Sequence, residues 1–379
     1  MLMLGRILQM LIKEFLQLRR NRNAQINLIV PPLIQLLIFG YAATYEVYHV
    51  STAVVDFDHS QESRELISRF TSNGRFDLVE QPPNRHRIRD LIDRSDAAVA
   101  IQVNPQFAEN LRKGQTASVQ VIVDGTNSNT ALIALGYIDQ IATRFAEDYQ
   151  NDRLNRIAPQ YRLLMPSVQM VERPWYNPDL NSKWFFVPGI IGSLTLMTIV
   201  NLTAFAVVRE REIGTLEQIL VTPIRPVEFI LGKTAPFFLI GLIQVVLIAL
   251  VGTLWFQVPF RGSVLVMLLG SSLFLVSTLA VGLLISTLCS TQQQAFASSF
   301  FFLTPAFTLS GFAFPIASMP PAMQWLTYLD PLRYYLVVLR GTFLKGTGLS
   351  ILWPQMLAMT ILGTALLAIS VLRFRKSLD

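Results

Sequence analysis

The sequence consists of long apolar stretches separated by short polar segments, with one long insert of mixed pattern after the first stretch. A helix that crosses a bilayer needs about 20 predominantly apolar residues. We therefore predict six transmembrane helices, at residues 23–45, 184–208, 234–255, 263–288, 295–314 and 350–372. No charged residue lies between Arg261 and Asp330, so the two central spans must fold back on each other near residues 286–295.

Composition agrees with this pattern. Of the 379 residues, 52% are hydrophobic and only 15% are charged, and the mean hydropathy of +0.44 lies outside the usual range of soluble proteins. The predicted fold class is a polytopic α-helical membrane protein with six transmembrane helices. An α/β extracytoplasmic domain is inserted between helices 1 and 2. Because Cys289 is the only cysteine, this domain has no internal disulfide and depends on packing alone.

Lysine and arginine residues near the spans set the orientation, because cytoplasmic loops carry the excess. Six spans place three basic segments on one side: Arg6, Lys13, Arg19, Arg20 and Arg22; Arg209, Arg211, Arg225 and Lys233; Arg373, Arg375 and Lys376. On the other side, Arg333, Arg340 and Lys345 weaken this asymmetry without reversing it. We predict cytoplasmic termini, a cytoplasmic loop at 209–233 and a cytoplasmic tail at 373–379. The net charge of +6 therefore does not imply a nucleic-acid partner.

Residues 1–22 combine apolar positions at helical spacing with basic residues on the opposite side. This pattern predicts a cytoplasmic amphipathic helix that lies along the inner leaflet and connects to the first span. The alternative is an unstructured basic start that only fixes the orientation. A cleaved signal peptide is disfavoured, because the apolar run is too long and contains Pro31 and Pro32 near its middle.

The insert, residues 46–183, is long enough for a domain with its own core. Strand-like runs at 51–56, 76–80, 97–103 and 118–124 alternate with helical patterns at 60–70, 85–94, 105–113 and 129–157. Such alternation predicts an α/β domain with a largely parallel sheet. The predicted topology places this domain outside the cytoplasm.

Candidate chemistry in the insert is sparse. Asp56, Asp58 and His59 lie close together after the first strand, but no second His or Cys cluster completes a metal site. A strand end that feeds a helix capped by Asp58 is the simpler interpretation. Residues 124–127, with the sequence Asp-Gly-Thr-Asn, favour a turn over a ligand site. We predict no catalytic residue and no metal site.

The cytoplasmic loop at 209–233 contains its own helical signals. Gly214 ends the incoming helix, Thr215 is a candidate N-cap, Glu217 falls in the first turn, and Pro223 ends the element. The apolar residues Ile213, Leu216, Ile219 and Leu220 recur at helical spacing. The pattern predicts a helix of about two turns with one apolar side, held at the membrane surface. Such a helix needs a partner on which to dock.

Two features that the sequence lacks limit which energy source can drive transport. The sequence has no G-x-x-x-x-G-K-[ST] loop to hold ATP phosphates. The predicted spans also lack the buried acids or histidines of a proton-driven carrier. Their polar groups are mild (Gln35, Asn201, Thr203, Gln244 and Ser310), and they either line a substrate route or join packed helices by hydrogen bonds. Energy for uphill transport must therefore come from another chain.

Several motifs resemble those of ABC-2 type permeases, the membrane subunits of type V ABC exporters. The loop carries Glu212-x-Gly214-Thr215-x-Glu217, followed by Thr222-Pro223. The distal segment carries Ser310-Gly311-Phe312-x-Phe314-Pro315-Ile316, Met319-Pro320, Asp330-Pro331-Leu332-x-Tyr334 and Arg340-Gly341. The outer domain and amphipathic start resemble the multidrug-export-like subgroup. This resemblance covers the whole chain, although the outer domain matches in placement and size rather than in any signature.

The resemblance implies three sets of functional residues. The coupling helix, Gly214–Val221, and its flanks would contact an ATPase subunit through Glu212, Gly214, Thr215, Leu216, Glu217, Ile219, Leu220, Thr222 and Pro223. The translocation route would include Asn201, Thr203, Gln244, Ser310 and Phe314. The outer re-entrant hairpin, residues 315–345, would include Pro315, Asp330, Pro331, Arg340 and Gly341.

The residue types in the hairpin support part of this assignment independently. Asp330 is a good N-cap, Pro331 suits the first helical position, and Gly341 suits a C-terminal stop. Arg333, three residues after Asp330, is placed to pair with it on the helix.

The resemblance implies a permease of the bacterial inner membrane that exports lipophilic or amphipathic, drug-like compounds. It would not itself be an enzyme, because a separate subunit would bind ATP and Mg²⁺ and hydrolyse the nucleotide. A second permease chain would pair with it around a route lined chiefly by spans two and five. Membrane lipid and a periplasmic membrane-fusion adaptor are further expected partners. An exporter of lipid or polymer cargo, an ion-coupled secondary transporter and a membrane-anchored sensor remain alternatives.

Overall fold

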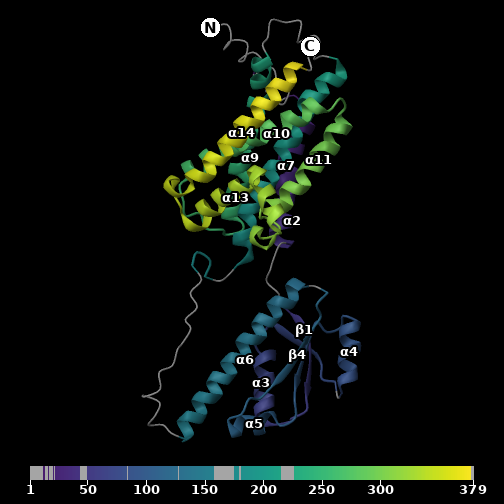
Figure 1. Ribbon diagram of the computed structural model, residues 1–379, viewed down its shortest axis with the longest axis vertical. Coiled ribbons are helices and arrows are strands. Elements are labelled where there is room, and N and C mark those ends of the chain that lie inside the picture. Colours follow the sequence, from purple (N-terminus) through teal and green to yellow (C-terminus); the bar gives the residue numbers. More distant parts are fainter. Residues whose placement is uncertain are drawn as a thin grey trace. The chain divides into compact units, whose positions relative to one another are not determined.

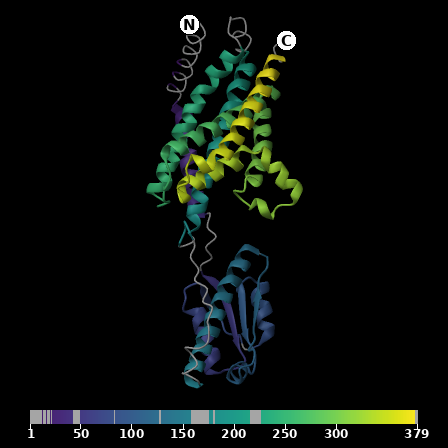
Figure 2. The same ribbon diagram turned by 60° about the vertical axis from the view of Figure 1, so that its left-hand side comes forward.

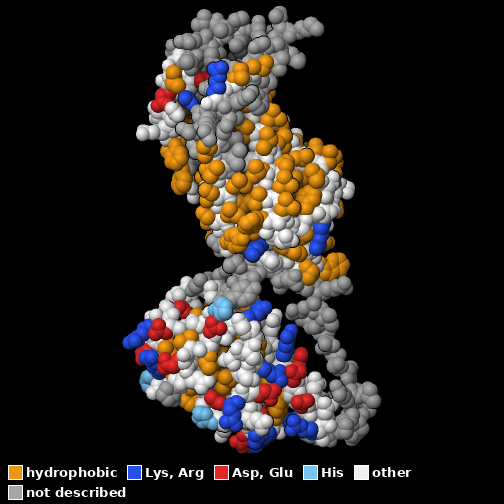
Figure 3. Space-filling model, turned by 180° about the vertical axis from the view of Figure 1, so that it is seen from behind, with side chains coloured by type: hydrophobic (Ala, Val, Ile, Leu, Met, Phe, Trp, Pro, Cys, Tyr) orange, Lys and Arg blue, Asp and Glu red, His pale blue; other side chains and the backbone are white. Residues whose placement is uncertain are grey.

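The computed structural model describes residues 12, 16, 20, 22–42, 49–82, 84–126, 128–157, 175–178, 181–214 and 226–376. The chain divides into two compact units. The helical unit comprises Met1–Thr44 and Pro174–Asp379, and the sheet unit comprises Tyr45–Arg173. Hydrophobic side chains dominate the face of the helical unit seen in Figure 3, whereas charged side chains are scattered over the sheet unit.

The helical unit is built from long helices that run side by side (Figures 1 and 2). They are α2 (Arg22–Ala42), α7 (Ser182–Ile213), α9 (Pro226–Leu254), α10 (Val264–Leu288), α11 (Gln292–Leu309) and α14 (Leu349–Lys376). Within the described ranges, α7, α9, α10 and α14 are long and apolar enough to cross a membrane. The remaining two predicted spans fall on α2, whose apolar part is Val30–Tyr41, and on α11, which has 18 residues.

Helix α7 lies at the centre of the helical unit, in contact with α2, α9, α10, α11 and α13 (Pro331–Arg340). Small residues allow the close packing that membrane helices require. A Cβ atom built on Gly282 of α10 would lie 2.6 Å from Thr203 Cβ and 2.9 Å from the Val200 carbonyl oxygen of α7. Across the other face of α10, Ser277 donates a hydrogen bond to the Met359 carbonyl of α14 at 2.8 Å. Close backbone approach therefore joins α7, α10 and α14.

One end of the helical unit carries aromatic and basic side chains together. Trp255, just after α9, donates its indole N–H to the Tyr41 hydroxyl of α2 at 2.9 Å. Lys183, near the start of α7, lies over the Tyr41 ring at 5.6 Å from its centroid. Arg261 lies over the Trp184 ring at 6.0 Å. Such side chains collect at the level of lipid headgroups, which marks this end as one membrane surface.

The segment between α11 and α14 consists of short helices: η2 (Ile316–Ser318), α12 (Pro321–Leu326), η3 (Thr327–Leu329), α13 (Pro331–Arg340) and the π-helix η4 (Gly341–Lys345). Asp330 is the N-cap of α13, accepting a hydrogen bond from the Leu332 amide at 2.9 Å, and Pro331 occupies the first helical position. Both predictions are confirmed.

The α-helix α13 ends at Arg340 with Gly341 as its C-cap, as predicted, but this cap is not left-handed. Gly341 is right-handed, with φ −62° and ψ −47°, and the chain continues through η4 to Gly346, which has φ +68°. Gly341 also allows close approach, since a Cβ atom there would lie 2.5 Å from the Thr347 hydroxyl oxygen and 3.1 Å from the Leu352 side chain of α14. The helical path ends at the glycine whose backbone is left-handed.

The sheet unit contains the strands β1 (Val50–Asp56), β2 (Phe76–Glu80), β3 (Val99–Val103) and β4 (Val119–Val123), in the order β2-β1-β3-β4. All four lie where the sequence pattern placed them, within two residues at each end. Strand β1 is parallel to β2 and β3, as predicted. Strand β4 is antiparallel to β3, so the sheet is mixed.

The direction of β4 follows from the position of α5 (Phe107–Lys113). Asp58, just after the carboxyl end of β1, accepts a hydrogen bond from the Ala108 amide at 3.0 Å. This contact holds the start of α5 at the carboxyl edge of the sheet rather than over a face (Figure 1). A chain that leaves α5 from that edge enters the sheet antiparallel to β3, because a parallel strand would have to start from the opposite edge.

The remaining helices cover the two faces of the sheet (Figure 1). Helices α3 (Gln61–Thr71) and α6 (Ser128–Ile157) pack on one face, around Leu66, Phe70, Phe76 and Ile101. Helix α4 (Arg85–Asp93) packs on the other face with Ile88 and Leu91.

The prediction that Asp58 caps the helix after β1 is wrong. The N-cap of α3 is Ser60, whose side chain accepts a hydrogen bond from the Ser63 amide at 3.0 Å. Burial alone would raise the pKa of Asp58, but hydrogen bonds from Ser60 and from the amides at the start of α5 lower it below its ordinary value. Asp58 thus caps α5, a helix distant in sequence. Asp124 accepts hydrogen bonds from the Thr126 amide and hydroxyl, at 2.9 and 2.7 Å, which forms the expected turn.

Candidate functional site

The candidate site is the last turn of α7, immediately before the loop with the predicted coupling helix. The helix ends at Ile213, and Gly214 follows with φ +78°, which favours glycine. Nothing lies within 4 Å of a Cβ atom built on Gly214, so its backbone conformation, not crowding, requires glycine. Glu212 is also described, whereas the remaining predicted coupling residues lie outside the described residues: Thr215, Leu216, Glu217, Ile219, Leu220, Thr222 and Pro223.

The first contact of this turn is an ion pair with α9. Glu210 Oε1 lies 2.5 Å from Lys233 Nζ, and the two side chains are only 12% and 6% exposed. A buried ion pair constrains geometry strongly, because moving one partner away leaves the other charge without compensation in a medium of low polarity. The pair therefore holds the ends of α7 and α9 together.

The second contact reaches the end of α10. Arg211 donates a hydrogen bond from Nη1 to the carbonyl oxygen of Cys289, the C-cap of α10, at 3.0 Å. The last carbonyls of a helix have no partner within it and carry partial negative charge, so a guanidinium group is a favourable partner. Cys289 itself is buried, with its Sγ atom 3.4 Å from the Ser298 hydroxyl of α11.

The third contact reaches the start of α11. Glu212 Oε2 accepts a hydrogen bond from the side-chain amide of Gln292, the first residue of α11, at 2.5 Å. This pair is exposed, so it contributes less to stability than the Glu210–Lys233 pair.

These three contacts share a simple geometric origin. Successive residues of an α-helix point about 100° apart, so three consecutive side chains point in three directions. Glu210, Arg211 and Glu212 accordingly contact α9, the end of α10 and the start of α11. We call this set of contacts the α7 junction. A movement of the loop after Gly214 can reach all three neighbouring helices through it.

Sequence reasoning identified Glu212 but missed Glu210, Lys233 and Gln292. The available signal was an acid and a base at opposite ends of one loop, each beside an apolar stretch. Charges at such positions must either reach water or find a partner. The contacts of Arg211 and Gln292 had no local signal, because their partners are more than 75 residues away in sequence.

The predicted route residues make different kinds of contact. Thr203 donates a hydrogen bond to the Ile199 carbonyl of its own helix, and Ser310 donates to the Phe307 carbonyl. Gln244 of α9 donates to the Thr198 hydroxyl of α7 at 3.1 Å. Among the residues that the structure describes, Asn201 has a buried amide oxygen without a hydrogen-bond partner, and Phe314 is 60% exposed. Gln244 thus joins two helices, whereas Thr203 and Ser310 bond within their own helix.

The predicted hairpin residues pack against the start of α7. The Arg340 guanidinium lies 3.8 Å from the centroid of the Phe185 ring and 3.5 Å from the Gly311 carbonyl oxygen. The expected pairing of Asp330 with Arg333 is wrong. Although both residues are described, Arg333 instead bonds to Thr327 and lies over the Tyr328 ring, 4.0 Å from its centroid.

Comparisons with known proteins fit this architecture. The model of the ABC-2 family transporter protein family matches residues 26–372. A probable multidrug ABC transporter permease of Escherichia coli, YbhR, is 36% identical over 355 residues, 93% of this chain and 94% of that protein. A second one, YbhS, is 33% identical over 99% of this chain and 98% of that protein. The E. coli inner membrane transport permease YhhJ is 30% identical over 91% of this chain and 93% of that protein.

Proposed function

This chain belongs to the ABC-2 transporter family, and on that premise we propose that it exports lipophilic or amphipathic, drug-like compounds. As an ABC permease it acts with an ATPase subunit. The names of two relatives, probable multidrug permeases, support the substrate class. ATP and Mg²⁺ would be bound by the partner, since this sequence has no phosphate-binding loop of the usual kind.

The proposed topology has six spans, α2, α7, α9, α10, α11 and α14, in the inner membrane. Basic residues support a cytoplasmic position for the end of α7 and for the tail. The aromatic and basic cluster at the start of α7 supports a second membrane surface at the opposite end, which is then the outer one. The sheet unit then lies outside the cytoplasm, where a periplasmic adaptor could contact it.

The α7 junction is the observation that carries the mechanism. The loop helix, residues 214–221, docks on the ATPase subunit, and ATP-driven closure of two such subunits moves the loop. Glu210, Arg211 and Glu212 pass this movement to α9, α10 and α11. A second permease chain faces α11, whose large apolar side chains Phe296, Phe300 and Phe301 are 61%, 65% and 82% exposed.

The docking step is tested by reversing the charge of the loop helix. The co-purified permease–ATPase complex is reconstituted in vesicles, and ATP hydrolysis and uptake of a fluorescent cationic dye are measured together. Glu217→Arg should reduce recovery of the ATPase subunit and stimulated hydrolysis at least fivefold. Glu147→Arg, at an exposed position of the sheet unit, is the matched control. Unchanged assembly and unchanged stimulation in Glu217→Arg would refute docking through this loop.

A further inference from the structure

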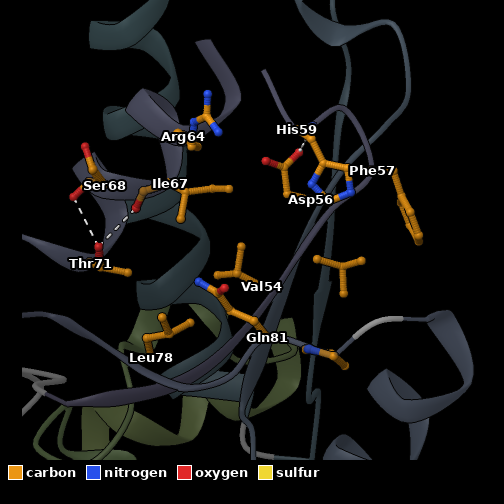
Figure 4. Close-up of a pocket in the computed structure, with 12 residues that line it drawn as sticks. Val54, Asp56, Phe57, His59, Arg64, Ile67, Ser68, Thr71, Leu78 and Gln81 are labelled. Carbon is orange, nitrogen blue, oxygen red and sulfur yellow. Dashed lines mark hydrogen bonds between the residues drawn. The ribbon is translucent and has the colours of Figure 1, made fainter. Parts of the chain in front are cut away.

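The sheet unit contains a cavity that the proposed transport mechanism does not use. Its volume is about 560 Å³ and it lies between α3 and the carboxyl ends of β1 and β2 (Figure 4). Val54, Ile67 and Leu78 form an apolar wall, and Arg64 and His59 also line the cavity. We call it the β1–α3 cavity. Small-molecule sites are usually of this size and combine an apolar wall with a few polar groups.

The cavity exists because β2 is shorter than its neighbour. Strand β1 pairs with β3 as far as Asp56, but with β2 only as far as Ala53. After Glu80 the chain leaves the sheet, and Pro82 follows two residues later. Within the described part of the chain, the last three residues of β1 thus have no strand partner on the side of β2. The space that a longer β2 would fill is open.

The acids on α3, β1 and β2, the elements that line this cavity, already have partners. Three of them form ion pairs: Glu62 with Arg112 at 2.9 Å, Glu65 with Arg69 at 2.7 Å, and Glu80 with Arg87 at 3.0 Å. Asp77 is hydrogen-bonded to His49 Nδ1 at 2.9 Å. The Asp56 carboxylate accepts hydrogen bonds from the amides of Asp58 and His59, both at 3.0 Å, and from the Ser63 hydroxyl at 2.7 Å. Each of these carboxylates therefore already has a partner and does not neutralise another basic side chain.

Arg64 and His59 are basic side chains at the cavity without such a partner. Among the residues that the structure describes, neither side chain makes an ion pair or a hydrogen bond. Arg64 projects from the first turns of α3, and His59 follows β1 (Figure 4). His59 has φ +52°, an uncommon conformation that the Asp56 carboxylate holds through the His59 amide. Left-handed non-glycine residues often occur at functional sites, because other interactions must offset their cost.

We propose that the β1–α3 cavity binds a small amphiphilic anion, with a carboxylate or sulfonate group on an apolar body. The Arg64 guanidinium offers two parallel N–H donors to such a group, and the His59 ring offers another donor. Val54, Ile67 and Leu78 contact the apolar body, and its burial drives binding. This site is independent of the docking of an ATPase, so its failure would leave the proposed transport function intact.

The test uses the full chain in nanodiscs of zwitterionic phosphatidylcholine. Binding of 4-phenylbutyrate and of its neutral analogue 4-phenylbutanamide is titrated by saturation-transfer difference NMR, with empty nanodiscs subtracted. The acid should bind at least tenfold more tightly than the amide. Arg64→Gln should weaken binding of the acid at least tenfold and leave binding of the amide within twofold. Charge-assisted hydrogen bonds are strong enough to give effects of this size.

Two further variants keep the proposal falsifiable. Arg144→Gln removes the same charge from an exposed position of α6 and should leave both affinities unchanged. Ser68→Trp places a large side chain in the cavity from the exposed side of α3, and should abolish binding of both compounds. Circular dichroism of each variant checks that the unit is folded. Equal binding of acid and amide, or full binding of the acid by folded Arg64→Gln or Ser68→Trp, would overturn the proposal.

Discussion

Acid–base pairs occur in both units, but in very different surroundings. Glu210 and Lys233 in the helical unit are 12% and 6% exposed and join two helices. Arg89 and Asp93 in the sheet unit are 86% and 67% exposed and lie on one helix, at 3.6 Å. Water screens the second pair, whereas the first would leave a buried charge if it were broken. An ion pair therefore fixes two helices relative to each other in the helical unit, whereas in the sheet unit it is a minor surface interaction.

The largest expected effect comes from breaking the buried pair. Glu210→Ala leaves the Lys233 ammonium group buried without this carboxylate, so we expect a loss of about 3–5 kcal/mol in stability. The thermal unfolding of the detergent-solubilised chain measures this loss. In vesicles, the variant complex should hydrolyse ATP while transport is strongly reduced.

A charge swap separates the pair from its individual residues. Glu210→Lys combined with Lys233→Glu restores an ion pair in reverse and should recover much of the stability and of the coupling between hydrolysis and transport. If the double variant is no better than the worse single variant, the pair does not act as a connector between α7 and α9.

The next largest difference in stability is expected between substitutions of two glycines, one in each unit. Gly282→Ala in α10 would place a methyl group against Thr203 and the backbone of Val200, which should cost about 1–3 kcal/mol. Gly136→Ala is the matched control, because Gly136 lies in α6 with nothing within 4 Å of an added Cβ atom. That change should stabilise α6 by about 0.5–1 kcal/mol. Equal effects of the two substitutions on unfolding would contradict the packing of α7 against α10.

A smaller effect is expected at the cap of α5. Asp58→Ala removes the acceptor for the Ala108 amide and should cost about 1 kcal/mol at neutral pH. The pKa of Asp58 is lowered from its ordinary value of 3.8. The carboxylate therefore contributes stability above that value and loses it as the pH falls through the folded pKa. Hydrogen exchange of α5 should differ between wild type and variant at pH 7 and converge once the pH falls below the lowered pKa of Asp58.

The smallest effect on stability is expected for the exposed Arg89–Asp93 pair. Arg89→Gln should change the free energy of unfolding by less than about 0.5 kcal/mol, because both side chains are well solvated. Thermal unfolding at low and high salt provides the measurement. A loss as large as that of Glu210→Ala would mean that burial does not distinguish the two pairs.

Local sequence signals predicted much of the fold. The predicted ranges 76–80 and 85–94 match β2 (Phe76–Glu80) and α4 (Arg85–Asp93), because period-two and helical patterns are set within a few residues. The cap and proline at the start of α13 were predicted for the same reason. The end of α7 was predicted from Gly214, whose left-handed backbone is a local property.

The features that were not predicted depend on residues whose partners are distant in sequence. The partner of Asp58 is 50 residues away, and that contact also fixes the direction of β4. Gly341 ends α13 as expected, but the π-helix that follows it and its close contacts with Thr347 and Leu352 were not predicted. The α7 junction was only partly predicted, because the pattern shows which residues are charged and not which helix each one faces. Tertiary contacts of this kind are not encoded in local periodicity.

The most direct test of the central claim is a crosslink from the loop that follows the α7 junction. A photoreactive amino acid replaces Leu216 in the complete complex, and Leu265, an exposed residue at the start of α10, is the control position. We predict that Leu216 captures the ATPase subunit and that Leu265 does not. Absence of the ATPase subunit from the Leu216 crosslinks, in a complex that still hydrolyses ATP and transports, would contradict the account.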